Sequence, residues 1–182
     1  SSVPLDNTIT VVFNRPVVPL TAIGEQAGLP QPLRIAPPVT GKGRWLNTAV
    51  YVFTPEEGLA PSTEYTLTVK SGLTDTSGGI LAEDYVWSFT TEPLSVVDFA
   101  PQGDSVSPNA VIYVAFNAPV VRRSVEESLS FIEKDTGRKI EGKFRWEDDR
   151  TVFFTPAEPL ALDTRYLVRL EKEVAGEAGG TL

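Results

Sequence analysis

The chain has 182 residues and a formal net charge of −8, with 24 acidic residues against 16 Lys and Arg. This acidic balance argues against a nucleic-acid partner, because phosphate-backbone binding requires clustered Lys and Arg. His and Cys are both absent, which excludes imidazole acid–base chemistry, thiol nucleophiles, disulfides and metal sites built on His or Cys.

Short runs of alternating apolar residues follow one another along the chain and predict half-buried antiparallel strands. The first covers residues 9–13, a second 65–69 and a third 85–89, and further runs follow at 94–99, 112–116, 151–154 and 166–170. Abundant Gly and Pro between them favour turns over helices. Helix is expected for at most one turn at 124–127, with Ser124 as its N-cap, and the stretch 19–26 is ambiguous.

The first half of the chain recurs in the second half. Residues 9–18 recur 103 residues later as 112–121, and residues 41–45 recur 101 residues later as 142–146. Phe53-Thr54-Pro55 and the stretch ending at Tyr65 also have counterparts, in the same order. A duplicated module of this length matches a small all-β domain. Because one sheet cannot bury its own apolar face, each module is expected to pack two sheets into a β-sandwich.

The module boundary is predicted at Pro93, giving domains 1–92 and 93–182. The strand at 85–91 has no counterpart in the second module, where Leu182 aligns with Leu81. The strand at 94–99 has no counterpart ahead of Thr8. The first module is therefore expected to lack its first strand, and the second module is expected to lack its last strand. The native polypeptide is expected to extend in both directions.

The large residues on the apolar faces form the predicted cores. Those of the two modules are Phe13, Trp45, Phe53, Tyr65, Leu67, Trp87 and Phe89, and then Phe116, Trp146, Phe154, Tyr166 and Val168.

Two loops have the form of a tyrosine corner, in which a Tyr at the start of a strand hydrogen-bonds backbone a few residues upstream. They span 59–65 and 160–166. A structural hydroxyl is favoured over a Tyr that donates protons or binds ligands, because a buried hydroxyl needs a partner and this loop supplies one.

Three other groups of residues are candidates for functional sites. The first group is the three tryptophans, Trp45, Trp87 and Trp146, which could stack on carbohydrate. Trp45 and Trp146 occupy the same repeat position, however, and this favours a role in the hydrophobic core. The acidic stretches 147–149 and 75–79 could bind Ca²⁺, but neither supplies six to eight oxygens, and both are typical of turns. Lys42, Arg44, Lys143 and Arg145 recur beside strands and are expected to pair with acids or lie along the sheet surface.

No phosphate-binding loop and no activated Ser occurs in the sequence. The sequence therefore predicts no enzyme activity, no catalytic, cofactor-binding or metal-binding residue, and no cofactor.

Several stretches together resemble the SbsA-type bacterial Ig-like domains and, more narrowly, the N-terminal region of bacterial alpha-2-macroglobulin-like proteins. They are Asn14, 16–20, 41–46, 51–69, 72–81 and 85–91, with a weaker copy in the second module. The resemblance implies two tandem antiparallel Ig-like β-sandwich domains. It also implies a non-catalytic structural segment of a protease trap, in an extracytoplasmic location, periplasmic or at the cell surface. The implied partners are other domains of the same longer chain and, through the full-length protein, a target protease, without direct membrane insertion by this part.

Residues 23–26, Ile-Gly-Glu-Gln, resemble the thioester motif of such traps, but Ile23 stands where the motif requires Cys. Without a thiolate no thioester can form, so the match is interpreted as chance. The alternative function is a pair of stalk modules from a cell-surface or adhesin protein, which the fold alone does not distinguish from a trap scaffold.

Overall fold

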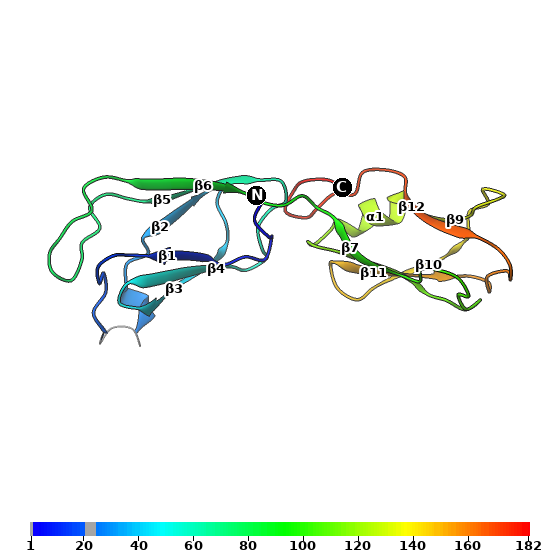
Figure 1. The fold of residues 1–182 in the computed structure, drawn as a ribbon, viewed down its shortest axis with the longest axis horizontal. Helices are drawn as coiled ribbons and strands as arrows, with labels where there is room; N and C mark the ends of the chain where they lie inside the picture. Colours follow the sequence, from blue (N-terminus) through cyan, green and yellow to red (C-terminus); the bar gives the residue numbers. More distant parts are fainter. Residues whose placement is uncertain (1, 21–24) are drawn as a thin grey trace. The chain divides into compact units, whose positions relative to one another are not determined.

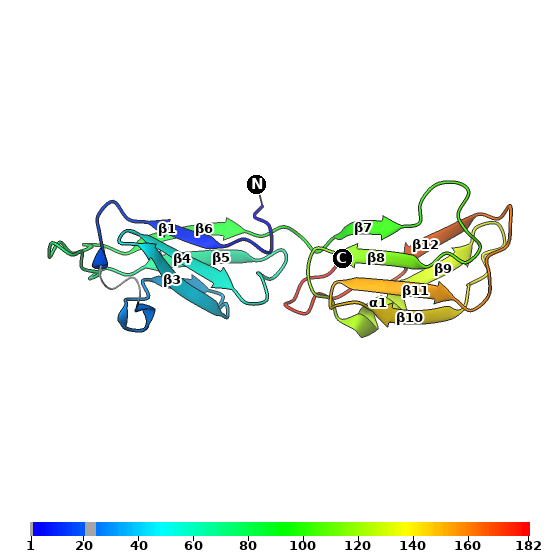
Figure 2. The same ribbon diagram turned by 90° about the horizontal axis from the view of Figure 1, so that it is seen from below.

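The computed structural model describes residues 2–20 and 25–182. The chain divides into two compact units, Ser1–Glu92 and Pro93–Leu182. In each unit the strands lie in two layers (Figures 1 and 2). All pairings between the named strands are antiparallel. The predicted fold, two tandem all-β antiparallel sandwiches, is confirmed.

The first unit consists of two three-stranded sheets. One has the order β1-β4-β3 and the other β2-β5-β6. The strands are β1 (Ile9–Val12), β2 (Leu33–Ala36), β3 (Gly41–Asn47), β4 (Val50–Pro55), β5 (Glu64–Val69) and β6 (Tyr85–Thr90), with a 3₁₀ turn η2 (Gln26–Gly28) ahead of β2.

The core of the first unit lies between these sheets because the alternating apolar residues of both turn toward one another. Ile9 from one sheet and Tyr65 and Leu67 from the other form one buried cluster. Trp45, Tyr51 and Val18 form a second. Phe53 packs against both clusters and joins them.

The second unit contains a four-stranded sheet and a two-stranded sheet. The orders are β10-β11-β8-β7 and β12-β9. The elements are β7 (Val96–Ala100), β8 (Ile112–Phe116), α1 (Arg122–Ser128), β9 (Leu129–Glu133), β10 (Gly142–Trp146), β11 (Thr151–Pro156) and β12 (Tyr166–Leu170). The buried cluster between the sheets is Ile112, Phe131 and Phe154.

The predicted core residues lie in or against the cores, with the exception of Val168. Trp45, Tyr65, Leu67, Phe116 and Phe154 are buried. The other predicted residues are half-buried, except Val168, whose exposed fraction is 41%. The prediction for Val168 is therefore wrong, and its physical reason is a missing neighbour: β12 is paired on one side only.

The expected helical turn begins two residues earlier than predicted, and Ser124 is not its N-cap. Helix α1 begins at Arg122, and its N-cap residue is Val121, without a side-chain cap. The Ser124 hydroxyl donates to the Val121 carbonyl at 2.7 Å and accepts the Ala175 N–H at 3.0 Å. The strands β2 and β9 were not predicted, because β2 has only four residues and the apolar residues of β9 do not alternate strictly.

Both tyrosine corners are confirmed. The Tyr65 hydroxyl accepts the N–H of Ala60 at 2.9 Å, and the Tyr166 hydroxyl accepts the N–H of Ala161 at 2.9 Å. Ser62 and Asp163, at equivalent loop positions, both have left-handed backbone with φ of 49° and 51°. The loops are therefore built in the same way.

Replacing Tyr65 by Phe should lower the free energy of unfolding of the first unit by about 0.5–1.5 kcal/mol while the fold is retained, because the Ala60 N–H loses its acceptor. Chemical denaturation followed by near-ultraviolet circular dichroism measures this change. An unchanged midpoint would contradict a stabilising corner.

Candidate functional site

Trp45 is held inside the first unit by Phe13, by Pro30 and by Gln26, the last residue of the stretch that resembles a thioester motif. Its indole N–H donates to the Pro30 carbonyl at 2.9 Å, and its ring stacks on Phe13 at 5.6 Å. The Gln26 side chain accepts the Trp45 backbone N–H at 2.9 Å and donates to the Trp45 carbonyl at 3.2 Å. Gln26 thus acts as a strand-like partner on the edge of β3. Ile23 and Gly24 lie outside the described residues.

The other two tryptophans differ in their surroundings. Trp87 packs against the buried cluster around Leu67. Trp146 has the equivalent register position, opposite the buried Val152, but it is only half-buried, whereas Trp45 is buried. Its indole N–H donates to the Glu126 carboxylate at 2.8 Å, and the Arg122 guanidinium lies 5.4 Å from the ring centre.

This Arg122–Trp146–Glu126 cluster was not predicted from the sequence. Both charged residues belong to α1. The position of α1 over the end of β10 cannot be predicted from the local sequence of α1 or from that of β10. The ring is covered on one side by a cation and its N–H is bonded, so the cluster has the character of a surface packing contact.

The acidic stretch 147–149 is a hairpin turn, as predicted. The Asp148 carboxylate accepts the backbone N–H groups of Arg150 and Thr151, each at 2.8 Å. The Arg150 N–H is the main reason that the pKa of Asp148 lies below its ordinary value. Asp149 binds the Arg122 guanidinium at 2.6 Å. These carboxylates are engaged in the turn and in an ion pair.

Asp75 has the same role in the stretch 75–79. It accepts the backbone N–H groups of Ser77 at 2.7 Å and Gly79 at 2.9 Å and lies 3.4 Å from the Arg15 guanidinium. The Gly79 and Ser77 N–H groups lower the pKa of Asp75. Within residues 2–20 and 25–182, no three His, Cys, Asp or Glu side chains group closely enough to hold a metal ion.

The basic residues at the repeated sheet positions also have structural partners. Lys42 lies 3.7 Å from the Glu56 carboxylate. The Arg145 guanidinium lies 4.3 Å above the ring of Phe153. The prediction that these residues pair with acids or lie along the sheet surface is confirmed at these two positions.

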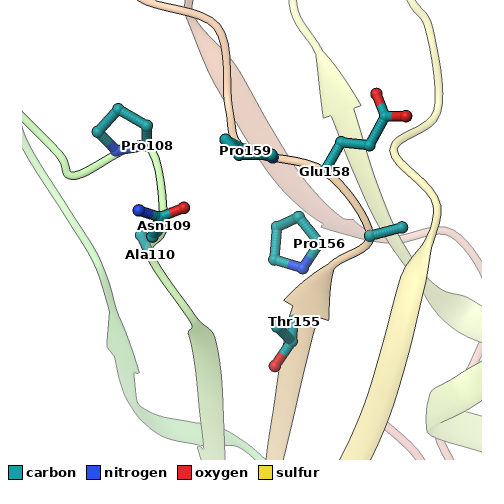
Figure 3. A pocket seen from close by; sticks show the side chains of 8 residues that line it. Pro108, Asn109, Ala110, Thr155, Pro156, Glu158 and Pro159 are labelled. Carbon is teal, nitrogen blue, oxygen red and sulfur yellow. The ribbon is translucent and has the colours of Figure 1, made fainter.

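A shallow hollow of about 160 Å³ lies in the second unit between the loop 108–110 and residues 155–159 that follow β11 (Figure 3). Its lining consists of three prolines, two alanines, Asn109, Thr155 and Glu158. Glu158 is the charged residue among its lining residues, and its carboxylate points away from Pro156 in Figure 3. No charged side chain of the lining is therefore directed into the hollow.

Asp84 provides a pH-dependent contribution to the stability of the first unit. Its carboxylate lies 2.5 Å from the Lys70 ammonium and accepts the Ser71 N–H at 2.8 Å. The bond to Lys70 is the main cause that lowers its pKa from 3.8 to about 2. A folded-state pKa below the unfolded value means that ionised Asp84 stabilises the fold above pH 4, and that this contribution is lost as the pH falls through about 2.

Replacing Asp84 by Asn should therefore lower the denaturant midpoint at pH 6, and the difference from the parent chain should shrink as the pH falls from 4 to 2. Denaturation series over this pH range measure it. A difference that is the same at pH 6 and pH 2 would show that the charge of Asp84 contributes nothing.

The comparison with known families matches the whole chain. The model of the bacterial Ig-like domain matches twice, at residues 1–91 and 92–182. Among curated proteins, the chain is similar to an alpha-2-macroglobulin homolog of Nostoc sp. (strain PCC 7120 / SAG 25.82 / UTEX 2576), at 28% identity over 94 residues. That match covers 50% of this chain and spans only 5% of the length of the Nostoc protein.

Among solved structures, two L,D-transpeptidases of Mycobacterium tuberculosis share a distant likeness. The first has 14% identity and a TM-score of 0.33, over 96% of this chain and 74% of the other. The second, L,D-transpeptidase 3, has 12% identity and a TM-score of 0.35, over 99% and 75%. At these scores the likeness carries no argument about this chain.

The duplicated sequence, the two antiparallel sandwiches and the paired family match agree. The chain belongs to the bacterial Ig-like domain family, of which it contains two tandem copies.

Proposed function

We propose that this chain is a non-catalytic structural segment of a bacterial alpha-2-macroglobulin-like protease inhibitor. The observation that carries the proposal is the similarity to the Nostoc alpha-2-macroglobulin homolog. Its partners are then the other domains of the same longer polypeptide, and the target protease is engaged only by the full-length protein.

The chemistry of the side chains supports a structural role. Gln26, Asp75, Asp148 and Trp146 all take part in turns, strand edges or packing contacts. Bacterial Ig-like domains are generally non-catalytic. The family and the Nostoc relative support an extracytoplasmic location. Among the described residues, no helix has the length and apolar character that a bilayer crossing requires.

The tandem arrangement favours a second candidate. Two copies of one domain account for the whole chain, and serial Ig-like modules also suit a stalk of a cell-surface or adhesin protein. The two candidates differ in what the complete gene product does to a protease.

The test compares the complete gene product with the 182-residue chain, using trypsin with a large protein substrate and a small peptide substrate. For a trap, the complete product should suppress digestion of the large substrate and spare cleavage of the small one, because an enclosed protease remains accessible only to small molecules. The 182-residue chain alone should change neither rate.

Two results would overturn the proposal. Equal digestion of both substrates in the presence of the complete product would favour the stalk. Suppression, or hydrolysis, by the 182-residue chain alone would show that this segment itself has inhibitory or catalytic activity.

A further inference from the structure

Most edge strands of this chain carry a feature that opposes pairing with another chain. An exposed edge pairs readily unless a charged side chain, a proline, an irregularity or a short length prevents it. Charged residues occur in most of the edge strands, namely Arg34 in β2, Lys42 in β3, Asp98 in β7, Glu133 in β9, Lys143 in β10 and Arg169 in β12. The registers of β3 and β7 are also irregular, and β1, which has no charge, is only four residues long.

The edge strand β6 has none of these protections. Its residues Tyr85–Thr90 include no charge and no proline, and all of them pair with β5 without a register shift. Tyr85 is 65% exposed and Val86 is 55% exposed. Figure 1 shows β6, in green, at the border of its layer with β5 beside it. β6 is therefore a regular, uncharged and partly apolar edge, which is the kind that pairs with a further strand.

Alternate residues of β6 direct their backbone groups to the outer edge. At the end of the strand, the Val3 N–H donates to the Thr90 carbonyl at 2.9 Å from this outer side. The N–H and C=O of one strand residue point to the same edge, and successive residues alternate between the two edges. The groups of Val86 and Ser88 therefore point outward, as those of Thr90 do, while the residues between them point to β5.

The side chains of β6 separate onto two faces. Tyr85 and Trp87 lie opposite Val69 and Leu67, which are buried, so their rings are on the inner face of the sheet. The two rings are 5.6 Å apart. Val86 is consequently on the outer face. An added strand would thus meet aromatic side chains on one face and an exposed valine on the other.

We propose that the outer edge of β6 is a self-association site, and that its occupant is β6 of a second copy of this chain. The two strands run antiparallel about a two-fold axis at Val86. Val86 then lies opposite the partner's Val86, and Tyr85 lies opposite the partner's Trp87. The sheets of order β2-β5-β6 from the two copies become one continuous sheet.

The bond from Val3 and the alternation select this register. Hydrogen bonds form only where outward-directed groups meet, so even-numbered residues must lie opposite even-numbered residues. An axis at Trp87 or Ser88 would require pairing at Thr90, whose carbonyl already accepts the Val3 N–H. An axis at Val86 pairs Val86 with itself and Ser88 with Asp84, and leaves Thr90 outside the contact.

The edge is self-complementary, which favours a second copy over a different partner. A two-fold contact places the same surface on both sides, so it succeeds only where that surface suits itself. Here, apolar residues lie opposite apolar residues. The charge at the end of the pairing is Asp84, which is 2.5 Å from the Lys70 ammonium of its own chain. The proposal does not depend on protease inhibition, because it concerns only the edge of this sheet.

The test measures association and edge pairing of the 182-residue chain together. Sedimentation equilibrium should show a mass that rises from 19.8 kDa toward twice that value between micromolar and near-millimolar concentration. Over the same range, hydrogen exchange at the Val86 and Ser88 amides should slow, whereas the Trp87 amide, which points to β5, should be protected throughout. Physiological salt is used because each copy has a net charge of −8 and the repulsion must be screened.

Charge variants test the axis at Val86. Val86→Lys and Val86→Glu should each raise the dissociation constant by about tenfold or more, because two like charges then lie opposite one another. An equal mixture of these two variants should associate again, because Lys then lies opposite Glu. Two controls should associate as the parent does. They are Val86→Thr, which adds no charge, and Val97→Lys on the β7 edge, where the valine is 60% exposed. Near-ultraviolet circular dichroism confirms that each variant is folded.

Four outcomes would overturn the proposal. The first is a chain that stays monomeric at near-millimolar concentration with rapid exchange at Val86 and Ser88. The second is a dimer that Val97→Lys weakens and Val86→Lys does not, since its contact lies elsewhere. The third is a mixture of the Lys and Glu variants that stays monomeric, which would exclude this axis. The fourth is a monomeric complete gene product in which these amides are protected at every concentration, because the edge is then covered by its own polypeptide.

Discussion

Replacing Leu67 by Ala is expected to lower the free energy of unfolding of the first unit by about 2–5 kcal/mol, because it leaves a cavity in a fully enclosed position. Leu67 is 0% exposed and lies between β2 and β6 at the centre of the cluster that includes Tyr65 and Ile9. Urea or guanidinium denaturation measures the change.

The second unit provides the matched control. Val168→Ala, at the equivalent position, is expected to cost about 1 kcal/mol or less in the 182-residue chain, because much of the removed surface already contacts water. Losses of equal size at the two positions would contradict the interpretation that a neighbouring strand decides the burial of this position.

Replacing Gly43 by Ala is expected to destabilise the first unit by about 1–3 kcal/mol, because the new methyl group has no space. A Cβ at Gly43 would lie 1.6 Å from the Tyr51 hydroxyl oxygen and 2.5 Å from the Gln31 side-chain oxygen. These two side chains are hydrogen-bonded to each other, and Tyr51 is buried, so they cannot easily move away.

A control and a rescue accompany this prediction. Gly28→Ala should change the midpoint little, since nothing lies within 4 Å of a Cβ at that position. The second unit has Phe144 where the first has Gly43, and Val152 where the first has Tyr51. The double change Gly43→Ala with Tyr51→Val should therefore cost less than the sum of the single changes. Strict additivity would show that Tyr51 is not the obstacle.

Features encoded over a few residues could be predicted from the sequence alone. Alternation with a period of two determined the β-class and the inward faces of β1, β5 and β8, because successive side chains of a strand point to opposite sides. The tyrosine corners and the turn roles of Asp75 and Asp148 were also predictable, since each hydrogen bond joins groups at most five residues apart. The duplication then determined that the architecture occurs twice.

The environments of equivalent residues were decided only by the tertiary structure. Trp45 and Trp146 share a repeat position, yet the segment ahead of β2 supplies Gln26 and Pro30 to Trp45, whereas α1 brings exposed charged groups to Trp146. These segments are where the two modules differ in sequence, and their contacts span 15 to 24 residues.

Leu67 and Val168 make the same point for burial. Both occupy the same place in the same alternating pattern, and that pattern correctly indicates which face each side chain takes. Whether the face is covered depends on a third strand beside it, which β5 has and β12 lacks. Periodicity is a local property of the chain, but burial is a property of the neighbours that the fold assembles, and only the structure shows which neighbours are there.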